Sequence, residues 1–197
     1  MPAAVNNPYL PPLFPRWNVA VMHIAGLTNP RGWDVRPMTQ GSDAPDTLEA
    51  QKDWVRRHGR VCVDGRHSLM TIYGDPEVNY AFRAWHEATH IRLNAPFTRA
   101  GEARVCAAQQ ADVAKLYGRR EAFMFAHILH CEILEQAEEL ERTGRFPADQ
   151  RAFTLSRLDL SIISELGGYA ANVERATGTG PVMLAKLPHG MPGTVLS

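Results

Sequence analysis

The hydrophobic and polar positions divide this chain into two unlike parts. Before Pro76 the apolar residues form short runs between turn-forming residues, whereas after it they recur at the spacing of a helix. Val78 and Phe82, for example, share one face of a predicted helix that begins at Pro76. The pattern predicts the α+β class, with a small, mostly antiparallel sheet followed by a helical half.

The part before Pro76 is predicted to hold an arm, three strands and one helix. Residues 1–17 are rich in proline, and we therefore expect them to form an extended N-terminal arm. The Asp64-Gly65 step is typical of a hairpin turn and favours an antiparallel pair of strands. The predicted elements are a strand at 17–26, a loop at 28–45, a helix at 46–58 that Asp46 or Thr47 caps, and strands at 60–63 and 67–73.

The part after Pro76 is predicted to be almost wholly helical as far as residue 176. Gly118 and Gly144 each follow a periodic apolar stretch, at a position where glycine commonly ends a helix. Residues 177–197 are rich in Gly and Pro and predict a tail, so that 18–176 forms a single domain. The further helices are expected at 102–117, at 119–142 and from Pro147 to about 176.

Charge and composition narrow the classes of function. The 197 residues include 21 basic and 21 acidic side chains, and this balance gives no reason to expect a nucleic-acid partner. No apolar run approaches the roughly 18 residues that cross a membrane, and the start lacks the layout of a secretory signal. The three cysteines are widely spaced without a C-x-x-C pair, which is typical of a reducing compartment. We therefore expect a cytoplasmic protein with no membrane partner.

The stretch "AWHEATHIRL" at 84–93 contains the pattern H-E-x-x-H. His86 and His90 lie about one helical turn apart, so both imidazoles can face one metal ion. Glu87 lies about 100 degrees around the helix from His86, and so stands beside that ion instead of binding it. This arrangement is typical of metal-assisted hydrolysis, in which zinc activates a water and an adjacent carboxylate takes the proton of that water.

These residues resemble the zincin metallopeptidases. "HEATH" looks like the active-site helix of that superfamily, and "GEARVCAAQQADV" is similar to the helix that supplies the third zinc ligand in its glutamate-type, or gluzincin-like, branch. The resemblance covers about residues 66–117 and implies a Zn²⁺-dependent peptidase that acts on peptide or protein substrates. The roles that it implies are zinc ligation by His86, His90 and Glu102, and general-base catalysis by Glu87.

The residues after the motif argue against a second branch of the superfamily. Metzincins extend the motif to H-E-x-x-H-x-x-G-x-x-H, but this chain continues from Asn94 to Phe97 without the required Gly or third His. Glu102 lies in the first turn of the next predicted helix, where a glutamate also interacts favourably with the helix dipole. The third ligand is therefore open at this point.

Two further histidines compete for that role. His127 and His130 share an apolar stripe of the helix predicted at 119–142, so both are expected to face inward. Either is a candidate third ligand, a hydrogen-bond partner of a ligand, or a group that stabilises an oxyanion. Tyr117 is a candidate for polarising a substrate carbonyl, whereas Glu132 falls off the stripe and is expected to be solvated.

Substrate binding and assembly each have a candidate segment. The strand predicted at 67–73 precedes the motif, as does the edge strand that holds peptide substrates in zincins by adding them to its sheet. The Pro-rich arm and the Gly- and Pro-rich tail support an alternative function, a structural or assembly component of a multi-subunit particle on a zincin-like scaffold. In that case the arms would join homo- or hetero-oligomers, and the protein would be particle-associated.

Overall fold

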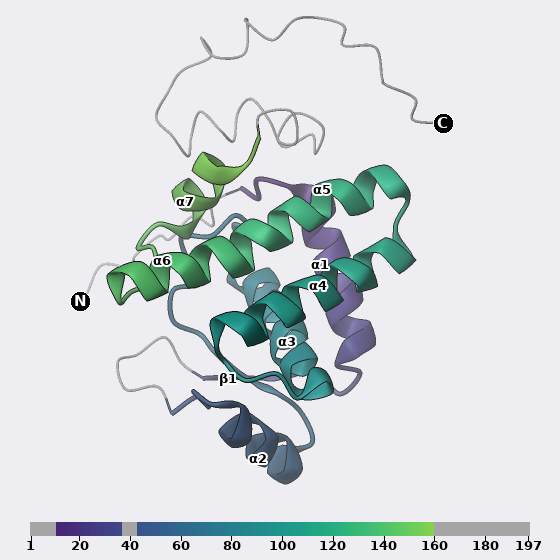
Figure 1. Ribbon diagram of the computed structural model, residues 1–197. Coiled ribbons are helices and arrows are strands. Elements are labelled where there is room, and N and C mark those ends of the chain that lie inside the picture. The colour runs from purple at the N-terminus through teal and green to yellow at the C-terminus, as the bar shows by residue number, and fades with distance from the viewer. Residues whose placement is uncertain (1–10, 37–42, 160–197) are drawn as a thin grey trace, which may run out of the picture.

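The protein is an α+β chain in which helices dominate (Figure 1). The computed structural model describes residues 11–36 and 43–159. The strands are β1 (Asp34–Arg36) and β2 (Cys62–Asp64), and the helices are α1 (Pro15–Thr28), α2 (Leu48–His58), α3 (Pro76–Leu93), α4 (Arg99–Leu116), α5 (Arg119–Leu129), the π-helical turn η1 (His130–Glu135), α6 (Gln136–Thr143) and α7 (Gln150–Arg157).

The segment predicted as a strand at 17–26 is helical, so that prediction is wrong. It belongs to α1, whose buried side chains are spaced three and four residues apart: Trp17, Ala20, Val21, Ile24 and Ala25. This spacing is that of one helix face, and Pro15 at the helix start has a backbone angle suited to it. The predicted arm also ends earlier than residue 17, because Leu13 and Phe14 are buried. Residues 1–10 of that arm lie outside the described residues.

The two strands form a parallel pair, not the antiparallel hairpin that the sequence predicted. Asp34 is in register with Cys62, and α2 provides the crossover that a parallel pair requires. The segment 67–73 is not a strand either. The Ile72 carbonyl accepts a hydrogen bond from the Leu13 amide at 2.9 Å, and Ile72 and Tyr73 are buried in the core. The segment therefore packs beside the start of α1 and does not pair with β2.

Two predicted helices are confirmed together with their caps. The Thr47 hydroxyl accepts a hydrogen bond from the Ala50 amide at 3.2 Å at the start of α2. The Asp75 carboxylate accepts one from the Glu77 amide at 2.9 Å at the start of α3. Such caps satisfy amides that the first helical turn leaves without partners. Both starts were therefore readable from the sequence.

The remaining helices follow their predicted ranges in part. α4 begins three positions before the predicted start, because Thr98 caps it and accepts from the Gly101 amide at 3.3 Å. The helix predicted at 119–142 is present as α5, η1 and α6, with a π-helical turn in its middle. The helix predicted from Pro147 to about 176 is shorter than predicted, because α7 ends at Arg157 and Leu158 adopts an extended conformation. The predicted residues from 160 onward lie outside the described part.

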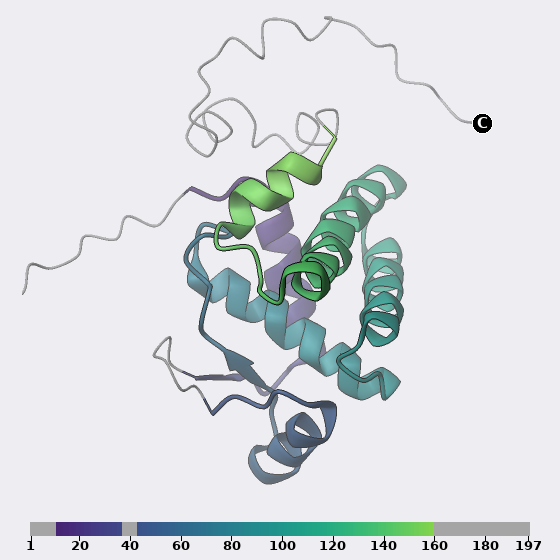
Figure 2. The same cartoon turned by 60° about the vertical axis from the view of Figure 1, so that its left-hand side comes forward.

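The core joins α1, α3 and α5 through large aromatic rings. Trp17 lies 6.3 Å from Trp85 and 5.0 Å from Phe125 between ring centroids, and all three side chains are buried. Burying each such ring contributes about 2 kcal/mol or more to folding. α3 lies in the middle of the molecule, with β2 and α2 on one side and α4 to α6 on another (Figures 1 and 2). Among the described helices, none combines the length and apolar character that crossing a membrane requires.

Candidate metal centre

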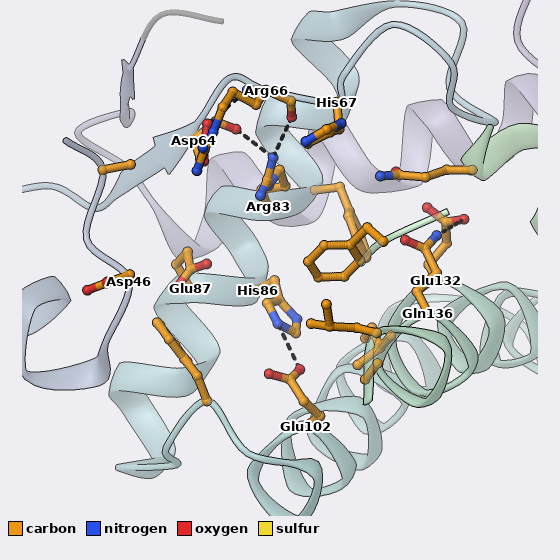
Figure 3. A pocket seen from close by; sticks show the side chains of 18 of the residues that line it. Asp46, Asp64, Arg66, His67, Arg83, His86, Glu87, Glu102, Glu132 and Gln136 are labelled. Atoms are coloured by element: carbon orange, nitrogen blue, oxygen red, sulfur yellow. Dashed lines mark hydrogen bonds and ion pairs between the residues drawn. The ribbon is translucent and has the colours of Figure 1, made fainter. Parts of the chain in front are cut away.

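Three side chains from α3 and α4 converge on one point (Figure 3). The Nε2 atoms of His86 and His90 lie 3.0 Å apart. One carboxylate oxygen of Glu102 lies 3.1 Å from Nε2 of His86, and the other lies 3.3 Å from Nε2 of His90. The structure therefore brings Glu102 to the histidine pair.

The outer nitrogens of both imidazoles face hydrogen-bond acceptors. Nδ1 of His86 lies 3.1 Å from Oε1 of Gln109, and Nδ1 of His90 lies 2.9 Å from the Ala95 carbonyl oxygen. Because neither oxygen can donate, each Nδ1 carries the proton in these bonds. In the neutral imidazoles the lone pairs are then on Nε2, directed toward Glu102, which is the orientation of a metal ligand.

Lone pairs that converge in this way need a positive charge between them. Burial by itself lowers the pKa of His86, but the Glu102 carboxylate outweighs burial and the pKa is raised. Burial alone would raise the pKa of Glu102, but the imidazoles of His86 and His90, which donate to its carboxylate when they are protonated at Nε2, prevail and lower it to about 2. Both shifts reflect a centre that favours added positive charge, which a proton or a metal cation supplies.

The short link between α3 and α4 sets the position of Glu102. Asn94 adopts the left-handed conformation with a φ of 49° and ends α3, and the Ala95 amide donates to the His90 carbonyl at 2.9 Å. The chain then passes so close to the first turn of α4 that a Cβ on Gly101 would lie 1.8 Å from the Pro96 carbonyl oxygen. Only glycine permits this approach, which places the next residue, Glu102, against the histidines.

Glu87 lies beside this centre and lines a cavity of about 580 Å³ together with His86 and Glu102. Figure 3 shows Glu87 projecting from α3 on the side of Asp46, whereas Glu102 approaches His86 from α4. The Oε2 atom of Glu87 is buried and has no hydrogen-bond partner among the described residues. Such an atom costs about 1–3 kcal/mol unless a water or ligand reaches it. The cavity is the route by which either would arrive.

The other predicted site residues lie elsewhere. His130 is exposed, with Nε2 3.6 Å from Glu135, and Nδ1 of His127 bonds to the Phe123 carbonyl of its own helix at 2.9 Å. The inward orientation predicted for this pair is wrong, because the buried stripe of α5 consists of Met124, Phe125, Ile128 and Leu129. The hydroxyl of Tyr117 lies 3.2 Å from His23, and Tyr117 does not line the cavity.

Glu132 is a cavity residue that sequence reasoning assigned to solvent. Its side chain is 8% exposed, and Oε1 accepts hydrogen bonds from Thr154 at 2.6 Å and from Gln136 at 3.1 Å. Burial raises its pKa to about 7, although these hydrogen bonds oppose the rise. It belongs to η1 and lies four positions after Ile128 and three after Leu129, so it continues the buried stripe of α5. The stripe predicted through His127 and His130 runs along a different side of the helix, and for this reason Glu132 was assigned to solvent.

The three side chains could hold a metal ion, and their spacing is compatible with zinc among other metals. Ligand atoms that share one zinc at about 2.0–2.2 Å must lie within about 4.3 Å of one another. The separations of 3.0, 3.1 and 3.3 Å found here satisfy that condition. Two imidazoles and one carboxylate also form a donor set of catalytic zinc sites, in which a further position stays open for water or substrate.

Comparisons with known proteins add no information about the site. No protein-family model, no curated protein and no solved structure matches the chain.

Proposed function

We propose that this protein is a zinc-dependent hydrolase that cleaves peptide bonds. The observation that carries the proposal is the convergence of the Nε2 atoms of His86 and His90 on Glu102, beside a cavity that Glu87 also lines. A metal ligand set that includes an open position, together with an adjacent base, is the minimum needed for hydrolysis by an activated water.

Each residue has a separate part in this proposal. His86, His90 and Glu102 would hold Zn²⁺, which when bound supplies the Lewis acidity that lowers the pKa of a water toward neutrality. Glu87 accepts the proton from the attacking water and passes it to the departing amine, because its carboxylate has an oxygen free of other donors. Gln109 and the Ala95 carbonyl hold the two imidazoles in the required tautomer.

The likeness to glutamate-type zincins supports this proposal. In both, a helix with H-E-x-x-H meets a glutamate from the following helix, and here α3 and α4 take those places. The sheet differs from the expectation, since β2 pairs in parallel with β1. We therefore extend the likeness to the metal centre and its chemistry, and not to the way in which the substrate is held.

Zinc retention and a single substitution test the proposal. Full-length protein treated with excess zinc and then desalted is expected to keep one zinc per chain by elemental analysis. A peptide library followed by mass spectrometry is expected to show cleavage that Glu87→Gln lowers by about 10²–10⁴-fold while the zinc is retained. The reason is that glutamine preserves the shape of the side chain but cannot take a proton.

Glu141→Gln is the matched control, because Glu141 lines the same cavity from α6 but does not belong to the ligand cluster. Its cleavage rate should stay near that of the wild type. Protein that keeps no zinc, or that cleaves equally well with Glu87→Gln, would show that the proposal is wrong.

A further inference from the structure

The strand that borders the cavity has its outer edge closed by side chains. The Asp34 amide donates to the Val61 carbonyl, and the Gly65 amide donates to the Arg36 carbonyl, at 2.8 and 3.0 Å. These bonds place the alternate residues, Cys62 and Asp64, with their amides and carbonyls on the opposite edge of β2. A peptide that added itself to the sheet would have to bind there.

Gln51 already occupies the position of such a peptide at Cys62. Its Nε2 donates to the Cys62 carbonyl at 2.7 Å, and its Oε1 accepts from the Cys62 amide at 3.3 Å. A side-chain amide thus makes both bonds that a neighbouring strand would make, and Gln51 is only 1% exposed. An extended substrate therefore cannot pair with Cys62 while α2 is in place.

Arg83 takes the next position along the same edge. Its Nη1 donates to the Asp64 carbonyl at 2.5 Å and to the Arg66 carbonyl at 3.0 Å. Both bonds use one nitrogen of the guanidinium, and its other N–H donors make no hydrogen bond with the described residues. Arg83 also lines the cavity. The nearby Asp64 carboxylate is engaged by Nε of Arg66 at 2.7 Å.

Arg83 stands one helical turn before the proposed base. Glu87 lies four positions later on α3, so the two residues share a face and lie about 5–6 Å apart at their Cβ atoms. Figure 3 shows Arg83 above His86, between the metal centre and the loop of Arg66 and His67. A group bound to Arg83 would therefore lie on the side of α3 that also carries His86 and Glu87.

The opposite wall of the cavity does not attract anions. It is formed by η1 and α6, whose lining residues are Glu132, Ile133, Gln136, Ala137, Leu140 and Glu141. Arg99, at the start of α4, lies 3.3 Å from the Glu141 carboxylate and 3.9 Å from that of Glu138. Arg99 is thus paired with carboxylates of this wall, whereas Arg83 is the cation best placed to bind an anionic ligand beside the metal centre.

From this arrangement we infer that the substrate is anchored by a carboxylate bound to Arg83, one turn from Glu87, and not by strand addition to β2. The inference rests on the proposed hydrolase function and names its substrate class: short peptides or peptide ends with a carboxylate close to the scissile bond. A cavity of about 580 Å³ accommodates a ligand of that size. The carboxylate belongs either to a C-terminus or to an acidic side chain.

Metal-binding probes test this inference without turnover. Four succinyl hydroxamates, coupled to glycine, glycinamide, glutamic acid α-amide or glutamine α-amide, are titrated calorimetrically into full-length, zinc-loaded protein. The hydroxamate is the same in all four, and the tails form two pairs that differ only in a carboxylate. In at least one pair the acid is expected to bind about tenfold or more tightly than its neutral partner. The glycine pair reports a C-terminal carboxylate and the glutamate pair an acidic side chain.

Substitutions then assign the preference to Arg83. Arg83→Met should bring the ratio of affinities within each pair close to one, and Arg83→Lys should restore part of the preference because it keeps the charge without the planar fork. Arg99→Met, which removes another cation of the cavity, should leave the ratio unchanged. Retained zinc and unchanged binding of acetohydroxamate, which has no tail, show that each variant keeps its metal centre.

Two results would overturn the inference. One is equal binding of acid and neutral partner in both pairs by the wild type, and the other is a preference that Arg99→Met removes and Arg83→Met leaves. The proposed function fails by a different measurement, the unchanged cleavage rate of Glu87→Gln. Zinc-loaded protein that binds none of the hydroxamates would contradict both.

Discussion

Two helices of this chain carry a histidine pair at helical spacing, and the pairs have different surroundings. His86 and His90 on α3 face Glu102 across 3.1 and 3.3 Å. On α5 and η1, His127 bonds to its own helix and His130 is exposed beside Glu135. The spacing of the histidines is nearly the same in the two places, so the spacing alone does not make a metal centre.

What distinguishes the first pair is the support that other segments give it. α4 contributes a carboxylate at the inner nitrogens, while Gln109 and the Ala95 carbonyl fix the outer ones. Among the described residues, the second pair has no ligand on an opposing helix, and the contacts of its imidazole nitrogens are with its own helix. A pair of ligands becomes a site when tertiary structure supplies the third ligand and fixes the tautomers.

The largest expected effect separates the two pairs directly. His86→Ala should abolish stoichiometric zinc binding, because only two of the three ligands remain. His127→Ala should keep one zinc per chain, since His127 makes no contact with the cluster. Elemental analysis of desalted protein, with circular dichroism as the check on folding, measures both. Equal zinc retention in the two variants would remove the distinction.

The segment formed by α5 and η1 contributes Glu132 to the cavity and not its histidines. The burial of Glu132 predicts that the stability of the protein depends on pH. Burial raises the pKa of Glu132 from 4.5 to about 7, so the folded state favours the protonated acid. Its contribution to stability is full below about pH 4.5 and is lost as the pH rises through about 7. Glu132→Gln should remove this loss. The free energy of unfolding of the variant, relative to that of the wild type, should therefore rise by about 3 kcal/mol between acidic and mildly alkaline pH.

Urea unfolding of wild type and variant at about pH 5 and pH 8 measures that difference. Glu135→Gln is the control, because Glu135 lies three positions on, is partly exposed, and pairs with Arg157 at 3.3 Å. Its stability relative to the wild type should change much less between the two pH values. A constant difference for Glu132→Gln at both pH values would contradict the assignment.

A pair of glycines sharpens the account of how Glu102 reaches the histidines. Glycine to alanine inside a helix normally stabilises a protein by up to about 1 kcal/mol, and Gly26→Ala in α1 should do so because nothing lies within 4 Å of the added Cβ. Gly101→Ala should instead destabilise by about 2 kcal/mol and weaken zinc binding, because its Cβ meets the Pro96 carbonyl. Thermal unfolding distinguishes them by the sign of the change, and a stabilising Gly101→Ala would contradict the proposed path of the link.

The smallest expected effect concerns the support of one ligand. Gln109→Ala removes the acceptor for Nδ1 of His86 and should weaken zinc binding about tenfold. Gln110→Ala is its neighbouring control, because Gln110 donates to the Ala126 carbonyl of α5 at 3.0 Å and does not touch the histidines. Competition with a chelating dye gives both affinities. Equal weakening by the two substitutions would show that the effect is not specific to His86.

The sequence predicted those features that depend on local chemistry. The caps at Thr47 and Asp75 are side-chain contacts with amides two or three residues away, so the sequence indicated where α2 and α3 begin. Glu102 was one of several candidates for the third ligand, and the structure places it next to His86 and His90, whereas His127 and His130 lie elsewhere. The role of His86, His90 and Glu102 as zinc ligands is the proposal made above.

Features set by distant contacts were not predictable in the same way. The segment 67–73 has the composition of a strand, but the Leu13 amide takes the carbonyl of Ile72, and β2 pairs instead with β1. Glu132 faces inward because it continues the buried stripe of Ile128 and Leu129, and which face of this helix is buried is decided by its contacts with distant segments, such as Thr154 of α7. The helix at 15–28 is a different case, since the spacing from Trp17 to Ala25 was present in the sequence and β-branched residues concealed it.

The contact between α3 and α4 also bears on the unfolded chain. A metal held by His86 and Glu102 closes a short loop, and a cross-link around a loop of about 15 residues restricts the unfolded ensemble by about 3 kcal/mol of free energy. Zinc would therefore act as a reversible cross-link between these two helices. In hydrogen exchange, amides of α3 and of the first turns of α4 should gain more protection on zinc addition than those of α2. The free zinc concentration would then determine which segment of the molecule unfolds last.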